Sequence, residues 1–156
     1  MTEFFSQYRD IIVFLHVISA VVWVGGMIAM RFAAHYSFVE LEPPLRLERT
    51  AHALKNLFNI VLPFVAILLV TALIMAIGLG LHHGEAKTIA FVKEGIWSIM
   101  ALNLGAMILR RNKAQKLIDV GEYAQAKLLL GRIGGAMVPV NIVLGIIAIF
   151  LGVTLS

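Results

Sequence analysis

Residues 15–35 read LHVISAVVWVGGMIAMRFAAH and form the centre of the segment that decides the class of the protein. From Ile11 to Met30 there are 20 consecutive residues without a formal charge. At ~1.5 Å per residue, a helix of that length covers the ~30 Å hydrocarbon core of a bilayer. The run is too long for a signal peptide, and Trp23 and Arg31 replace a small-residue cleavage site. We therefore expect a mature membrane-spanning helix.

The composition of the whole chain supports the same class. Of the 156 residues, 60% are hydrophobic and 14% are charged, which is far more apolar than a soluble domain of this length needs. The basic residues lie between apolar runs and form no patch on a soluble face, so we expect no nucleic-acid partner. Cysteine is absent, which leaves histidine, methionine, lysine and carboxylates as ligands for a metal or haem.

Four apolar runs are each long enough to span a membrane, and we place them at residues 11–36, 57–81, 89–109 and 133–155. The prediction is an all-α fold: one transmembrane domain covering residues 1–156, built as a four-helix bundle with both termini on one side. Pro43-Pro44 should break the first connection, and Gly121 the third. The chain should be embedded in a lipid bilayer as a monomer or a homodimer.

The distribution of lysine and arginine predicts the orientation of the bundle. The side that holds the first and third connections carries ten of the thirteen: Arg31, Arg46, Arg49, Lys55, Arg110, Arg111, Lys113, Lys116, Lys127 and Arg132. The other side carries only Arg9, Lys87 and Lys93. Because positive charge marks the cytoplasmic face, both termini and the turn at His82-His83 should lie outside. This is the orientation expected in a bacterial inner membrane, with periplasmic termini.

The first span carries an imidazole, and buried ionisable groups in membranes mark pathways, ligands or cofactors. His16 precedes Trp23 by seven residues and Met27 by eleven, so these side chains share one helical face. Ser19, Ala20 and Met30 fall on the same face, which should look into the protein. In the fourth span, Gly134-Gly135 and Gly145 offer small surfaces for close packing.

The third span has a comparable face, formed by Lys93, Trp97, Met100 and Met107 at spacings of four, seven and fourteen from the lysine. Such a stripe suits an interior cofactor, and it also suits ordinary core packing. Lys93 lies at the same predicted depth as His16, so the two could meet. Alternatively, Lys93 could extend toward the membrane surface beside Glu94.

A second group of candidates lies toward the other face of the membrane. His35 closes the first span, and His52 begins a face of the second span. His16 and His35 are 19 residues apart, ~28 Å along a helix, so they cannot serve one cofactor. Two histidine-centred sites, one toward each face, would resemble a transmembrane electron-transfer protein; the alternative is that His35 and His52 are solvated interfacial residues. Arg31, Arg49 and Arg110 lie at that level and could bind haem propionates.

The turn between the second and third spans contains His82-His83 and Glu85. Imidazole and carboxylate groups together suit copper or zinc, which makes this turn a candidate metal site. The alternative is a pair of exposed histidines without a ligand.

The first span resembles that of the HemJ-type membrane protoporphyrinogen oxidases. In that family a leucine- or phenylalanine-histidine pair is followed by a tryptophan seven residues after the histidine, a small-residue pair and an arginine; here these are Leu15-His16, Trp23, Gly25-Gly26 and Arg31, with His35 near a further histidine of the family. Phe91-Val92-Lys93 is similar to the family's Trp-Leu-x-x-Lys entry. The same LHVISAVVWVGG also resembles the first span of the copper-resistance D family.

The first resemblance implies a haem-binding protein whose functional histidine and lysine are His16 and Lys93. We therefore expect haem b in a four-helix bundle, with His16 as the axial ligand of the iron. Further candidate haem-binding residues are Lys93, His52, His35, Arg31 and Trp23. The expected role is electron transfer of a protoporphyrinogen oxidase-like kind, with a tetrapyrrole or quinone as partner. One alternative is copper transport or handling through His16, the methionines and His82-His83. A third is a purely structural membrane subunit without a cofactor.

Overall fold

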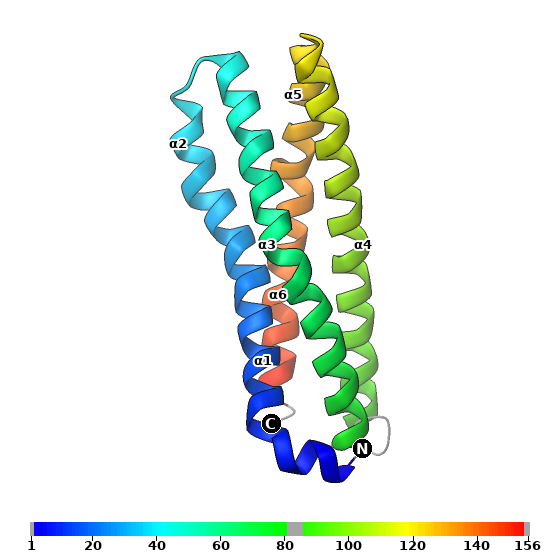
Figure 1. Ribbon diagram of the computed structural model, residues 1–156. Helices are drawn as coiled ribbons and strands as arrows, with labels where there is room; N and C mark the ends of the chain where they lie inside the picture. The colour runs from blue at the N-terminus through cyan, green and yellow to red at the C-terminus, as the bar shows by residue number, and fades with distance from the viewer. Residues whose placement is uncertain (1, 81–85, 155–156) are drawn as a thin grey trace.

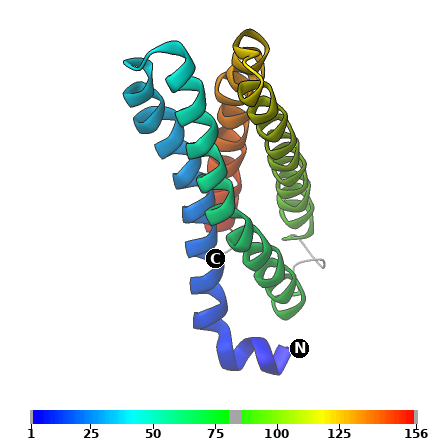
Figure 2. The same cartoon turned by 45° about the horizontal axis from the view of Figure 1, so that its top comes forward.

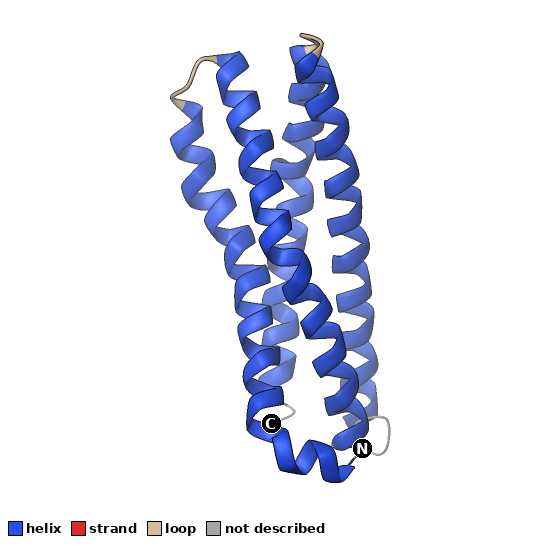
Figure 3. Ribbon diagram, in the orientation of Figure 1, coloured by secondary structure: helices blue, strands red, loops and turns tan. Residues whose placement is uncertain are grey.

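The computed structural model describes residues 2–80 and 86–154, and in these ranges every regular element is helical (Figures 1 and 3). The elements are α1 (Thr2–Ala29), the π-helix η1 (Met30–Ala34), α2 (His35–Val39), α3 (Pro43–Gly78), α4 (Ala86–Asp119), α5 (Tyr123–Arg132), the π-helix η2 (Ile133–Met137) and α6 (Val138–Val153). They form four long helical columns, each long and apolar enough to cross a membrane. The all-α class and the four helices are as predicted.

The four columns form one bundle in which α3 and α6 separate α1 from α4. Helix α1 packs on α3 and α6, and α4 packs on α3, α5 and α6. Both ends of the chain lie at the same end of the bundle, which is the lower end in Figure 1. The faces of α1 and α4 that carry the predicted site residues are therefore directed at each other across the interior.

The predicted inward faces are confirmed by burial. Trp23 and Met27 of α1 are 1% and 0% exposed, and Met100 and Met107 of α4 are buried with them in a single core. His16 and Lys93 lie on the same two faces and are half-buried. Spacing in the sequence was sufficient to find these faces because a straight helix repeats every 3.6 residues.

Both predicted breaks are present. Glu42 is extended (φ −54°, ψ 143°) before Pro43-Pro44, as the residue before a proline is expected to be, and α3 begins at Pro43. Gly121 has φ +80° and separates α4 from α5, which returns toward the bundle. A positive φ is accessible to glycine without a steric penalty, so the glycine at this position allows the tight turn.

Gly145 is a point of close approach between the fourth column and its neighbours. A Cβ placed there would overlap the Val24 side chain and lie 3.3 Å from the Met100 Cε atom, so α6 approaches both α1 and α4 through this glycine. The prediction of close packing is confirmed for Gly145 and wrong for Gly134 and Gly135, where a Cβ would meet nothing within 4 Å. The latter pair lies in η2, where the helix itself is irregular.

We expect Gly145→Ala to destabilise the bundle, because the added methyl group cannot fit without moving Val24. Overpacking of this kind costs ~1–3 kcal/mol, measured as a lower midpoint of thermal unfolding in detergent. The matched control is Gly25→Ala, because Gly25 is exposed and its Cβ would meet nothing within 4 Å. Equal stability of the two variants would contradict the close approach of α6.

The first helix changes direction at Tyr8, whose φ −114° and ψ 19° are not helical. The segment before it turns across the end of the bundle, as Figures 1 and 2 show. Phe5 is buried there against Gly78 at the end of α3. The predicted first span begins at residue 11 and does not include this segment. Pro63, which could have bent α3, lies within a continuous helix.

Two asparagines join α4 to the fourth column inside the apolar core. Asn103 Nδ2 donates to the Met137 carbonyl and to Asn141 Oδ1, both at 2.8 Å, and Asn141 Nδ2 donates to the Met100 carbonyl at 3.3 Å. Asn141 is fully buried. The backbone hydrogen bonds of the fourth column are irregular here, because Pro139 has no N–H to donate and the π-helix η2 lies just before it. The asparagine side chains hold the two columns together at this level.

Candidate cofactor site

His16 is held from α3 by a threonine. The imidazole Nδ1 lies 3.0 Å from the Thr71 Oγ1, and the threonine side chain is only 4% exposed. The Thr71 hydroxyl itself donates to main-chain carbonyls of its own helix, Ile67 at 2.8 Å and Leu68 at 3.1 Å. The hydroxyl has one proton, and when that proton is used in either of these bonds the oxygen is the acceptor towards His16.

This arrangement selects one form of the neutral imidazole. Because Thr71 accepts, Nδ1 of His16 carries the proton, and the lone pair is then on Nε2. Metal-binding histidines in proteins commonly have their second nitrogen bonded in this way, which fixes the ring orientation and the tautomer. His16 is therefore prepared to donate a lone pair from Nε2.

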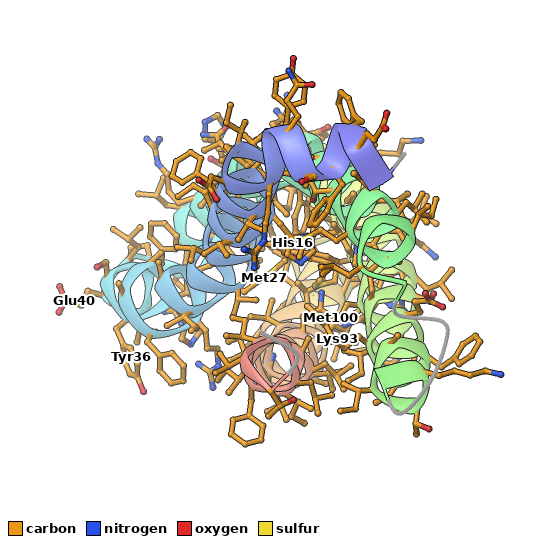
Figure 4. The ribbon with its side chains drawn as sticks, turned by 90° about the horizontal axis from the view of Figure 1, so that it is seen from below. His16, Met27, Tyr36, Glu40, Lys93 and Met100 are labelled. Atoms are coloured by element: carbon orange, nitrogen blue, oxygen red, sulfur yellow. The ribbon has the colours of Figure 1, made fainter. Side chains whose placement is uncertain are left out.

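Lys93 approaches His16 from α4. Its charge reaches the imidazole, and the view along the bundle in Figure 4 shows both side chains directed into the interior, as are those of Met27 and Met100 at other depths. A Cβ on Gly152 would lie 3.3 Å from the Lys93 Nζ, so the absence of a side chain at that position leaves room for the ammonium group. The structure thus brings together the two residues that the sequence analysis placed at one depth.

Two indole N–H groups in the same core have no acceptor among the described residues. They are the Nε1 atoms of Trp23 on α1 and Trp97 on α4. Leaving a buried donor unpaired costs ~1–3 kcal/mol, so such groups usually have a partner. A ligand with acceptor atoms in the interior would satisfy them.

An apolar cavity of about 500 Å³ lies between α1 and α3, at the end that holds the termini. Tyr8, Ile11 and Leu15 of α1 line it together with Ile67 and Thr71 of α3. Thr71 is therefore shared between this cavity and His16. The cavity is of the size and character of sites that take large apolar ligands.

The candidates toward the other end are not gathered into one site. His35 is exposed and packs edge to face on Tyr36, with ring centroids 5.9 Å apart, while His52 is exposed in a polar cavity between α3, α4 and α5. The Arg31 guanidinium lies 5.8 Å from the centre of the Phe32 ring. Figure 4 places Tyr36 and Glu40 at the periphery of the bundle. His35 and His52 therefore lie in separate surroundings, and their role as haem-binding residues stays a prediction.

The predicted metal patch at His82, His83 and Glu85 lies outside the described residues. Within residues 2–80 and 86–154 there is no group of three or more histidine, aspartate and glutamate side chains placed to hold a metal ion. A single axial histidine with a non-carboxylate partner, as at His16, is a different kind of site and does not require such a group.

Three functional candidates were missed by the sequence analysis: Thr71, which orients His16; Asn103 with Asn141, which joins two columns; and Arg111, which is buried. A signal was present for all of them, because each is a polar residue within or beside a long apolar run.

Comparison with known proteins gives no family assignment: no protein-family model, curated protein or solved structure matches the chain. The class of the protein therefore rests on its fold: an all-helical bundle whose four long apolar helices are able to span a membrane. The resemblance of the first span to haem- and copper-associated families stays a prediction.

Proposed function

We propose that the protein is an integral membrane protein that binds b-type haem through His16 and takes part in electron transfer. The observation that carries this proposal is the His16–Thr71 pair, in which the bonded Nδ1 leaves Nε2 as a lone-pair donor inside the bundle. The resemblance of residues 15–35 to the HemJ-type oxidases supports the same residue independently.

Lys93 of α4 is the donor group across the interior that would supply a second ligand, because its charge reaches the imidazole. The thioethers of Met27 and Met100 are buried in the same core, but at eleven and seven residues from His16 and Lys93, or ~16 and ~10 Å along the helices, they lie deeper in the bundle. The neutral amine of lysine has the lone pair that iron requires, and cysteine is absent from the chain. Haem iron when bound would exchange single electrons, and its potential depends on which axial ligand is used.

The remaining residues of the site would bind and shield such a group. The Trp23 and Trp97 N–H groups offer two hydrogen bonds in a core that excludes water, and the apolar walls keep the local dielectric low. The absence of a side chain at Gly152 leaves room beside the Lys93 Nζ. The proposed electron partner is a membrane-dissolved tetrapyrrole or quinone, for which the apolar cavity beside Thr71 is a suitable entry.

The proposal is tested by the absorption spectrum of the purified protein in detergent. We expect a Soret band that shifts and sharpens when dithionite is added, with one haem per chain by pyridine haemochrome assay. A sample that holds stoichiometric copper and shows no Soret band would replace haem binding with copper handling, for which the buried methionines and His16 are suitable soft and borderline ligands.

The proposed orientation, with both termini outside and the α4–α5 turn in the cytoplasm, has its own test. We expect a topology reporter fused after Ser156 to be active outside, and one inserted at Gly121 to be active inside, because ten of the thirteen basic residues lie at the Gly121 end. Activity of the Ser156 fusion in the cytoplasm would overturn the orientation without affecting the fold.

A further inference from the structure

Three hydrogen-bond donors lie in the interior of the bundle between α1 and α4. Two are the indole Nε1 atoms of Trp23 and Trp97, which are buried and have no acceptor in the described part of the chain. The third is the ammonium group of Lys93, which is half-buried and directed into the interior in Figure 4. Indole and ammonium groups can donate hydrogen bonds but cannot accept them. Together they favour a ligand that only accepts.

The contacts of Gly145 place the two tryptophans at nearly the same height in the bundle. A Cβ at Gly145 would touch both Val24 of α1 and Met100 of α4, and these two helices run in the same direction from the end that holds the termini (Figure 1). Trp23 lies one residue before Val24, and Trp97 lies three residues before Met100. Their Cα atoms therefore differ by only ~3 Å in height, on helices that face each other across the interior.

Lys93 lies one turn from Trp97 on the same face of α4, a separation of ~6 Å along the helix. Its Nζ lies 3.3 Å from the Cβ position of Gly152. Gly152 follows Gly145 by seven residues, and Lys93 precedes Met100 by seven, so the ammonium group is at the height of its own Cα atom and extends across the bundle. Helical side chains lean toward the N-terminus of their helix, which brings both indoles toward the lysine.

The charge of Lys93 has no counter-ion in the described part of the protein. No carboxylate of residues 2–80 and 86–154 acts on it, and the neighbouring Glu94 is exposed. His16, on which the lysine does act, is an imidazole and carries no negative charge. A cation that is partly buried is costly unless an anion comes close. The interior thus offers one positive charge and two N–H groups, without a described carboxylate that would repel an anion.

We propose that the haem-free chain binds a small inorganic anion of the halide class between Lys93, Trp97 and Trp23. A halide accepts hydrogen bonds from any direction, which suits donors that come from opposite sides of the bundle and from different heights. The apolar walls favour the larger halides, because these are the least strongly hydrated and are the easiest to remove from water. Binding of the Lys93 amine to iron, as proposed above, would release the anion, but the anion site itself does not require haem.

The test is the fluorescence of the full chain, purified in detergent without added haem and titrated with iodide at constant ionic strength. Trp23 and Trp97 are the two tryptophans of the whole sequence, so the signal reports on this site alone, and iodide quenches an indole that it contacts. We expect quenching that saturates and that chloride reverses. Because no haem is added, the result is independent of whether the chain shows a Soret band.

Two variants remove one donor each. Lys93→Met keeps a similar length and removes the charge, and it should weaken iodide binding at least tenfold, a ratio that corresponds to ~1.4 kcal/mol. Loss of a charge from a span also favours insertion, so this variant should fold. Trp97→Phe keeps an aromatic ring in the core and removes the N–H, and it should weaken iodide binding about tenfold, read from the remaining Trp23.

The matched control is Lys87→Met, which makes the same change at an exposed lysine near the start of α4 and should bind iodide like the wild type. Quenching that rises with iodide without saturation would indicate collisions alone and would overturn the proposal. Equal iodide affinity in Lys93→Met and Lys87→Met would do the same. An unchanged affinity in Trp97→Phe would also contradict it, because the indoles would then have no part in the site.

Discussion

His16→Ala should give a protein that inserts and folds but has lost its haem, or holds it in a high-spin form. The loss follows because the axial lone pair is removed, while the fold is expected to survive for a structural reason. The Thr71 hydroxyl keeps its bonds to the Ile67 and Leu68 carbonyls, so the substitution leaves no polar group of the pair unsatisfied. Removing a polar side chain from a span also favours insertion.

The measurement is haem per chain and the spin state, read from the Soret and visible bands of the purified variant. Added imidazole should enter the vacated space and restore the low-spin spectrum. His35→Ala is the matched control, because it removes an exposed imidazole from the same column, and it should leave the spectrum unchanged. An unaltered low-spin spectrum in His16→Ala would exclude this residue as a ligand and favour the copper or a purely structural role.

The parts of this structure that the sequence predicted well are those that depend on helical periodicity. Apolar length predicted the four columns, and the spacing of His16, Trp23 and Met27 predicted the buried face of α1. Turn chemistry predicted the breaks at Pro43 and Gly121. These features are local, in that each follows from residues less than about four turns apart.

The parts that were missed depend on contacts between columns. Thr71 is 55 residues from His16, and Arg111 reaches a main-chain carbonyl 60 residues away; no periodicity within one helix indicates which helix will face it. The change of direction at Tyr8 is fixed by Phe5 meeting Gly78 at the far end of α3. The polar cavity that His52 lines was not predicted, because spacing gives a face and not the polarity of what covers it.

The role of Thr71 can be separated from that of a packing residue by Thr71→Val, which keeps the shape of the side chain and removes the hydroxyl. His16 then loses the acceptor that holds Nδ1–H, so the imidazole can rotate and change tautomer. Loss of such a supporting bond lowers metal affinity by about 10–100-fold, or ~1.4–2.8 kcal/mol. We expect that loss as faster transfer of haem to apomyoglobin, together with a shifted reduction potential.

Thr71→Ser should restore the wild-type rate and potential, because serine keeps the acceptor oxygen and lacks only a methyl group. Thr88→Val, at an exposed position of α4, makes the same chemical change away from the site and should alter neither quantity. If Thr71 only fills space, Thr71→Val will match the wild type in haem transfer and potential, and Thr71→Ser, with its smaller volume, will be the less stable protein. If Thr71 orients the imidazole, Thr71→Ser will retain haem better than Thr71→Val. Serine keeps an oxygen near Nδ1 and so preserves the lone pair on Nε2, whereas valine does not.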